Sequence, residues 1–305
     1  MSFAQSPALD LRDGDRVVFV GGTFIERMQQ FGDLELLLTV AHPEKHITFR
    51  NLGWSGDTVW GESRALFGSP VDGLSRLIND VKAAEPTLLV VCYGSNEAHA
   101  GEAGREQFIE GLNHLLDQLA DTHARVVLLS PYAYRPGPPG VPSPAAYNAN
   151  LKTYCHAISE LAAKRSAPYF SLFDLLDVLQ AQTNGKSEAP VTDNGVHLTG
   201  TGYRLAAVEI AKRLGVEVPR LDLAAADERL ARLRAAIQFK NELYFHRYRP
   251  QNETYLFLFR KHEQGNNAVE IPQFDPLVEE QEKLIAELKQ SANRLTEKQS
   301  PAKQE

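Results

Sequence analysis

The sequence predicts an α/β protein in which a five-stranded parallel sheet lies between two layers of helices, a three-layer α/β/α sandwich. Two observations predict this architecture. Five apolar runs of strand length are separated by segments with helical periodicity. Most of these runs lack the alternation of apolar and polar residues that is typical of a strand with one solvent-exposed face. Strand following helix in this way favours parallel strands joined by right-handed crossovers.

The predicted strands are short segments rich in β-branched and aromatic residues. They are residues 16–20, 46–50, 87–93, 125–130 and 169–172. Because their apolar character is nearly continuous, we expect helices to cover both faces of the sheet.

Between the strands, apolar residues recur three and four positions apart, which places them on one face of a helix. The three clearest stripes are Leu74, Leu77, Ile78 and Val81; Phe108, Leu112, Leu115 and Leu119; and Tyr147, Leu151, Tyr154, Ile158 and Leu161. The third helix also shows its start, with Ser143 as the expected N-cap and Pro144 at the first helical position. A further helix is expected over residues 199–214.

The pattern changes after Pro219, which predicts an α/β domain at residues 1–218 and a mainly helical C-terminal extension at residues 219–305. Two charged helices with apolar stripes are expected there. Their stripes are Leu223, Leu230, Leu233 and Ile237, and then Leu277, Leu284, Leu288 and Leu295. The aromatic stretch between them, residues 244–262, is either two strands or a helical or irregular segment. The polar tail from Gln299 is expected to be disordered.

Composition argues against several function classes. The formal charge of -7 and the pI near 5.8, without a basic cluster, argue against a nucleic-acid partner. Cys92 and Cys155 are too few for a disulfide framework and are expected to be buried thiols. No stretch approaches about 20 apolar residues, so we expect no membrane-spanning helix. The chain as it stands is expected to be cytoplasmic, whereas removal of an export signal would make it periplasmic or secreted.

Five short motifs are placed where they can meet in such a sheet. They are residues 21–23 (GGT), 51–58 (NLGWSGDT), 93–97 (YGSNE), 130–131 (SP) and 193–197 (DNGVH). Sites in open α/β sheets form beyond the carboxyl ends of the strands, and all but the last motif directly follow a predicted strand. The last precedes the helix at residues 199–214 and is expected on a loop at the same edge.

These motifs contain the parts that a hydroxyl nucleophile needs, namely a base, a group that orients the base, and donors for the developing oxyanion. His197 is the candidate base because an imidazole titrates near neutral pH. The alternative for it is a surface or helix-cap histidine. Asn96 can point two N–H donors into a cleft, with capping of the next helix as the alternative.

Gly56 and Thr23 complete the candidate site. A glycine in the turn after the second strand lets a backbone N–H approach a ligand closely, and a plain turn glycine is the alternative. Thr23 would present its hydroxyl at a strand-to-helix turn. The alternative is a structural role, in which Thr23 is the N-cap of the helix and Glu26 completes a capping box.

Taken together, the ordered motifs resemble those of the SGNH, or GDSL-type, hydrolase family over roughly residues 15–214. The resemblance implies a flavodoxin-like sandwich and ester hydrolysis. It places the family's serine at Thr23, the glycine donor at Gly56, the asparagine donor at Asn96 and the histidine base at His197.

The chain departs from the family pattern in two places. Gly21-Gly22-Thr23 stands where the family has Gly-Asp-Ser. The family's triad acid lies three residues before the histidine, at the position of Asn194, while Asp193 lies one residue further back. Either Asp193, through a one-residue bulge, or the amide of Asn194 would then orient His197.

The resulting expectation is a hydrolase that deacylates a carbohydrate or other small ester through an acyl-enzyme, with no cofactor and no metal. Aromatic residues near the predicted cleft are expected to contact the substrate. They are Trp54, Trp60, Tyr93 and Tyr132. Two alternatives stay open. One is a catalytically impaired ligand-binding protein on the same fold, and the other is an interaction protein whose extension docks a partner or forms a homo-oligomer.

Overall fold

The computed structural model describes residues 8–183, 190–217 and 227–299. Its centre is a sheet of five strands in the order β2-β1-β3-β4-β5, and every neighbouring pair is parallel. The strands are β1 (Arg16–Gly21), β2 (Thr48–Asn51), β3 (Leu88–Cys92), β4 (Arg125–Leu129) and β5 (Tyr169–Phe170). The predicted sheet is therefore confirmed, and only the strand ends differ, by one or two residues.

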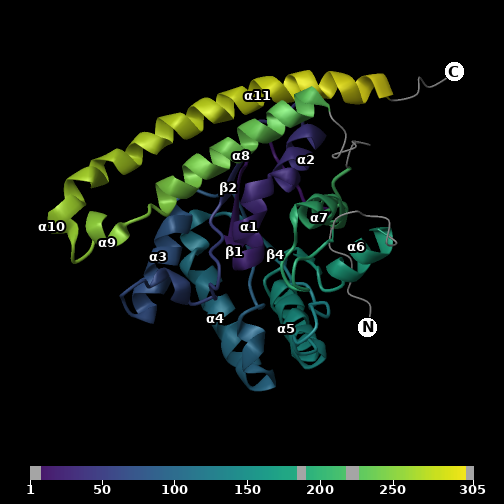
Figure 1. Ribbon diagram of the computed structural model, residues 1–305, viewed down its shortest axis with the longest axis vertical. Helices are drawn as coiled ribbons and strands as arrows, with labels where there is room; N and C mark the ends of the chain where they lie inside the picture. Colours follow the sequence, from purple (N-terminus) through teal and green to yellow (C-terminus); the bar gives the residue numbers. More distant parts are fainter. Residues whose placement is uncertain (1–7, 184–189, 218–226, 300–305) are drawn as a thin grey trace.

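Helices cover both faces of this sheet (Figure 1). Those of the α/β body are α1 (Thr23–Phe31), α2 (Asp33–Ala41), α3 (Pro70–Ala83), α4 (Arg105–Gln118), α5 (Ala145–Lys164), α6 (Leu175–Thr183) and α7 (Gly200–Arg213). Short 3-10 turns join them at η1 (Glu62–Arg64), η2 (Glu97–Ala100), η3 (Glu102–Gly104) and η4 (Ala120–Thr122). None of the helices within the described residues is long and apolar enough to cross a membrane.

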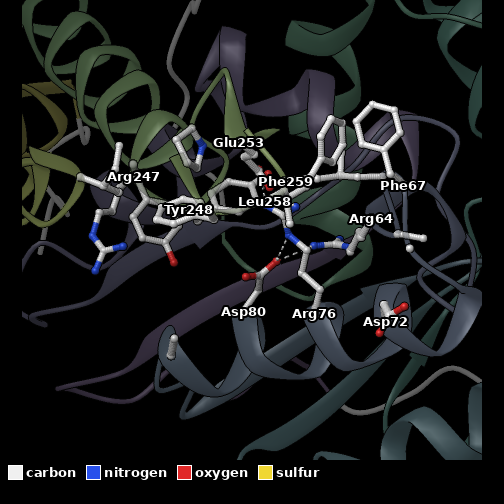
Figure 2. Close-up of a pocket in the computed structure, with 18 of the residues that line it drawn as sticks. Arg64, Phe67, Asp72, Arg76, Asp80, Arg247, Tyr248, Glu253, Leu258 and Phe259 are labelled. Carbon is white, nitrogen blue, oxygen red and sulfur yellow. Dashed lines mark hydrogen bonds and ion pairs between the residues drawn. The ribbon is translucent and has the colours of Figure 1, made fainter. Parts of the chain in front are cut away.

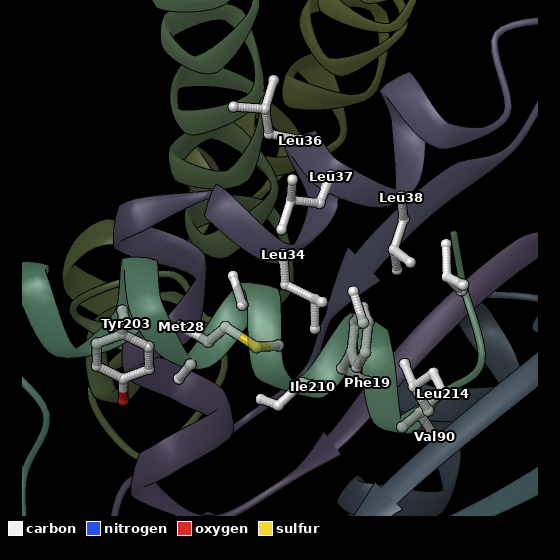
Figure 3. Packing of buried hydrophobic residues seen from close by; sticks show 14 of the residues in the cluster. Phe19, Met28, Leu34, Leu36, Leu37, Leu38, Val90, Tyr203, Ile210 and Leu214 are labelled. Atoms are coloured by element: carbon white, nitrogen blue, oxygen red, sulfur yellow. The ribbon is translucent and has the colours of Figure 1, made fainter. Parts of the chain in front are cut away.

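The core consists of two clusters, one on each face of the sheet. On β1, Val17 and Phe19 belong to the cluster with α1, α2 and α7, while Val18 and Val20 belong to the cluster with α3, α4 and α5. Figure 3 shows the first cluster, in which Phe19 lies among side chains of α2 and α7. Each fully buried aliphatic side chain contributes about 1.5–3 kcal/mol. Both faces of β1 are buried, which explains why the sequence of this strand shows no polar alternation.

Helix α5 begins one residue later than the sequence predicts. Its N-cap is Pro144, without a side-chain capping bond, and its first residue is Ala145. The Ser143 hydroxyl still accepts a hydrogen bond from the Ala145 N–H at 3.3 Å. The sequence therefore predicts a helix start at this place correctly, but one residue too early.

The C-terminal extension is mainly helical in its described part, with short turns between the helices. It contains α8 (Glu228–Tyr248), α9 (Glu253–Leu256), α10 (Lys261–Gln264), η5 (Gly265–Gln273) and α11 (Phe274–Gln299). The two-strand alternative for residues 244–262 is wrong, because this segment contains the end of α8 followed by α9 and α10. The predicted boundary at residues 218 and 219 and the tail beyond residue 299 lie outside the described residues, so both stay predictions.

Helix α8 joins the extension to the α/β body, and α11 packs along α8 (Figure 1). Leu233 and Ile237 of α8 belong to the same core cluster as the sheet residues. Beside them, the Lys240 ammonium is fully buried and lies 2.7 Å from a carboxylate oxygen of Glu35 on α2. The same ammonium donates to the backbone oxygen of Phe49 on β2 at 3.0 Å.

Candidate active site

A small polar pocket lies beyond the carboxyl ends of β1 and β3, where the strand order reverses. Its volume is about 90 Å³, and its lining includes Thr23, Asn96 and His197. We call it the strand-end pocket. Crevices at such reversal points are the usual ligand sites of open α/β sheets. Three candidate residues from motifs more than 70 residues apart in sequence are thus brought to one place.

Thr23 is the first residue of α1, and the N-cap position belongs to Gly22. No side-chain capping bond is present at this helix start, so Thr23 and Glu26 do not form the capping box that the sequence also allowed. Instead the Thr23 hydroxyl oxygen accepts a hydrogen bond from the Gly56 backbone N–H at 3.3 Å. The hydroxyl and a candidate oxyanion donor are therefore neighbours.

Asn96 follows β3 and begins η2, but its side chain does not cap that turn. Its Nδ2 donates to the backbone oxygen of Asp57 at 2.7 Å, which joins the loops after β2 and β3. Glu97 joins the same loops, because its two carboxylate oxygens accept the N–H groups of Val59 and Gly94, each at 2.9 Å. Burial raises the pKa of Glu97 to about 7, although these backbone hydrogen bonds act to lower it.

His197 is oriented by Asn194. The Asn194 Oδ1 accepts two backbone N–H groups, from Val196 at 3.0 Å and from His197 at 2.8 Å. This fixes the amide so that its Nδ2 lies 3.1 Å from His197 Nδ1. An amide nitrogen can only donate, so Nδ1 accepts and the neutral imidazole carries its proton on Nε2. A histidine base needs the opposite tautomer, with a free lone pair on Nε2.

Asp193 has a different partner. Its carboxylate lies 3.6 Å from the Arg27 guanidinium. The pKa of His197 is lowered, first by burial and then by the positive charge of Arg27, while the Asp193 charge acts in the opposite direction. The hydrogen-bond partner of the imidazole is therefore Asn194, and Asp193 acts on it through charge alone.

The candidate nucleophile and the candidate base do not contact each other. Among the described residues, no hydrogen bond joins the Thr23 hydroxyl to the His197 ring, although both line the strand-end pocket. Catalytic hydrogen bonds of unliganded enzymes are often long or absent and form only with substrate.

The aromatic candidates divide into three groups. Tyr93 and Tyr132 line the strand-end pocket, and their hydroxyls donate to Asp57 Oδ2 at 3.0 Å and to the Val196 backbone oxygen at 2.8 Å. Trp60 lines a neighbouring hollow, which shares Asn96 and Glu97 with the strand-end pocket. Trp54 is only 3% exposed, and its ring lies under arginine side chains. A buried ring of this kind packs the protein and offers no face to a substrate.

No sequence pattern predicts the contacts that hold Trp54. Arg249, just after α8, lies with its guanidinium carbon 3.7 Å from the centroid of the Trp54 ring, and it donates to Glu26 at 2.8 Å. The same Glu26 oxygen accepts the Ser55 N–H at 2.5 Å. Tyr248 donates to the Gly53 backbone oxygen at 2.9 Å. The C-terminal end of α8 thus holds the loop that carries the Gly56 donor.

Comparisons with known proteins show what this chain is similar to. The model of the GDSL-like lipase/acylhydrolase family matches residues 29–205. The match includes Gly56, Asn96, Asn194 and His197, but it begins after Thr23. No curated protein matches the sequence.

Solved structures share the fold. A GDSL-like lipase from Parabacteroides merdae superposes with a TM-score of 0.54 at 18% identity, covering 69% of this chain and all (100%) of its own. A gut microbial diltiazem-metabolizing enzyme superposes with a TM-score of 0.54 at 19% identity, covering 70% of this chain. The present chain spans about half (49%) of the length of that enzyme.

Proposed function

Since the chain belongs to the GDSL-like lipase/acylhydrolase family, which is the SGNH hydrolase family, we propose that it hydrolyses a small ester at the strand-end pocket. The observation that carries this proposal is the meeting of Thr23, Asn96 and His197 in one pocket, with the Gly56 N–H on the Thr23 hydroxyl. A hydroxyl, an imidazole and two donors are the parts that acyl transfer requires.

In the proposed reaction, His197 reacts as its less populated tautomer, which carries the proton on Nδ1 and leaves the Nε2 lone pair free. The Thr23 oxygen attacks the ester carbonyl carbon while this Nε2 takes the hydroxyl proton. The N–H groups of Gly56 and Thr23 and the Asn96 amide donate to the oxyanion. The C–O bond then breaks, and His197 returns the proton to the leaving alcohol. A water molecule releases the acyl group from Thr23 by the same steps.

The size of the pocket limits the substrate. A volume of about 90 Å³ has room for a short acyl group and not for a sugar ring or a long chain. The alcohol part must then lie outside, where Tyr134 at the pocket edge offers a ring for contact with a carbohydrate. We propose a short-chain ester of a carbohydrate or of another small alcohol.

One observation favours a second function, ligand binding with little turnover. Asn194 donates to Nδ1 and so places the imidazole proton on Nε2, where the base lone pair is needed. In a serine protease, an acid-to-amide change at the orienting residue lowers kcat about 10⁴-fold for this reason. The pocket would then hold an ester whose carbonyl oxygen accepts hydrogen bonds, with slow cleavage.

The test compares hydrolysis of short-chain p-nitrophenyl esters and acetylated sugars by the intact protein and three variants. Thr23→Ala and His197→Ala should each abolish turnover. Ser95→Ala removes the other aliphatic hydroxyl of the pocket lining and should leave part of the activity. Turnover that survives Thr23→Ala would contradict an acyl-enzyme on Thr23. Saturable binding of the acetylated sugar without product in the intact protein would establish the second function instead.

A further inference from the structure

A second and larger cavity lies where the loop after η1 meets the C-terminal extension. Its volume is about 750 Å³. Apolar side chains from two segments nearly 200 residues apart form part of its lining. They are Leu66, Phe67, Phe257, Leu258 and Phe259. We call this cavity the C-terminal hollow. Figure 2 shows Phe67 and Phe259 on one side of it and a group of charged side chains on the other.

The apolar side chains at the hollow are strongly exposed. Phe67 is 74% and Phe259 is 67% exposed, and their rings meet edge to face with centroids 5.6 Å apart. Isolated exposed apolar residues are ordinary, but contiguous apolar patches on a protein surface commonly mark binding sites. The two phenylalanines come from different segments and still form one surface.

The arginines of the hollow are paired within the protein. Arg76 makes two hydrogen bonds of 2.5 Å to the Glu253 carboxylate (Figure 2). Arg64 donates to Asp57 at 2.7 Å and to Asp80 at 3.3 Å.

Arg247 is paired as well, because it donates to Asp275 at 2.8 Å. Asp72 accepts from Ser69 at the start of α3 and has no cationic partner among the described residues. An anionic ligand would therefore lose its hydration without gaining an unpaired cation.

We propose that the C-terminal hollow is a binding site for an uncharged aromatic molecule. Its volume lies within the range of small-molecule sites, about 300–1,000 Å³. An aromatic ring can pack edge to face against Phe67 and Phe259 in the way that these two rings pack against each other. Because the arginines of the hollow are paired, a neutral ligand fits better than an anionic one.

This site is distinct from the strand-end pocket. The buried Asp57–Arg64 ion pair stands between them, with Asp57 in the lining of the pocket and Arg64 in the lining of the hollow. Binding to the hollow therefore needs no ester cleavage, and its test does not depend on the proposed function.

Two fluorescent probes test the proposal, N-phenyl-1-naphthylamine and 8-anilinonaphthalene-1-sulfonate. They share one aromatic system, and the second adds a negative charge. The neutral probe should bind the intact full chain saturably with one site, and the anionic probe should bind at least about tenfold more weakly. Equal or tighter binding of the anionic probe would overturn the claim that the ligand is uncharged.

Variants locate the site. Phe67→Ser and Phe259→Ser should each weaken binding of the neutral probe about tenfold, since each removes an aromatic wall. Phe239→Ser and Val141→Ser are matched controls, because these side chains are 49% and 55% exposed on other parts of the surface. They should leave binding unchanged. Far-ultraviolet circular dichroism of every variant shows that the fold is retained.

Two results would contradict the proposal. Binding that survives both Phe67→Ser and Phe259→Ser, or that is lost in Phe239→Ser, would place the probe elsewhere. A stable dimer of the intact chain that dissociates in Phe259→Ser would show that a second copy of the chain occupies the apolar surface. Analytical ultracentrifugation of the intact chain and of this variant distinguishes these cases.

Discussion

The strand-end pocket and the C-terminal hollow differ in size and in the parts of the fold that form them. The pocket measures about 90 Å³ and is lined by polar groups that hydrogen-bond one another, while the hollow measures about 750 Å³ and carries exposed phenylalanines. The pocket forms at loops that directly follow strands of the sheet. The hollow forms where a helical extension meets the body. The arrangement of polar groups in the strand-end pocket is therefore set by the fold of the body. The apolar surface of the C-terminal hollow depends instead on how the extension packs against the body.

The largest effect that we predict comes from restoring an acid in the strand-end pocket. In Asn194→Asp, one carboxylate oxygen keeps the two backbone N–H groups and the other accepts the Nδ1 proton of His197. The Nε2 lone pair becomes free, so kcat for short-chain esters should rise by up to about 10⁴-fold. Asp193→Asn is the control and should change kcat little, because Asp193 faces Arg27. An unchanged kcat in Asn194→Asp would contradict the assigned tautomer.

The next effect concerns the attachment of the extension. Lys240→Ala leaves the Glu35 carboxylate buried without its partner and should lower the free energy of unfolding by about 3–5 kcal/mol in urea titrations. Lys283→Ala, an exposed change on α11, is the control. The double variant Lys240→Met, Glu35→Leu should recover most of the loss. A loss below about 1 kcal/mol in Lys240→Ala would show that this pair does not fasten α8 to the body.

A smaller effect is expected where the extension reaches the strand-end pocket. Arg249→Ala removes the contact with Glu26 and Trp54, so the loop carrying the Gly56 N–H should loosen and kcat should fall by up to about 10²-fold. Arg249→Lys keeps the charge beside Glu26 and should recover part of the rate. Arg247→Ala, which breaks only the pair with Asp275, should not change kcat. Equal kcat values for all three variants would show that the extension does not affect catalysis at the strand-end pocket.

The smallest effect is a shift in pH dependence. The positive charge of Arg27 helps to lower the pKa of His197, so Arg27→Gln should raise that pKa, by about one unit at most. The base must be neutral, and the acidic limb of the kcat/KM profile should therefore move to higher pH. A shift to lower pH, or an unshifted imidazole titration followed by nuclear magnetic resonance, would contradict the assigned cause.

Much of the body was predictable because its signals are local. The apolar runs gave all five strands, and the glycine and polar motifs after them placed Thr23, Asn96 and His197 at one sheet edge. Glu97 and Asp57 lie inside two of these motifs, yet their roles as loop ties depend on backbone groups that no spacing specifies. Glu97 accepts two backbone N–H groups, and the Asp57 carbonyl oxygen accepts from Asn96.

Contacts with the extension were not predictable from the sequence. The position of Trp54 next to the strand-end motifs suggested substrate binding, but Arg249, nearly 200 residues later, covers its ring. The pairing of Phe67 with Phe259 is of the same kind. Such contacts depend on how one helix crosses the body, and hydrophobic periodicity gives the buried face of a helix but not its neighbour.

The tautomer of His197 is the most direct test of the account, because every statement about turnover depends on which ring nitrogen carries the proton. Long-range proton–nitrogen correlation spectra of the imidazoles, recorded above their pKa and assigned by comparison with His197→Ala, measure it. We predict a proton on Nε2 in the intact protein and on Nδ1 in Asn194→Asp. A proton on Nδ1 in the intact protein would contradict the orientation of the Asn194 amide and the account that follows from it.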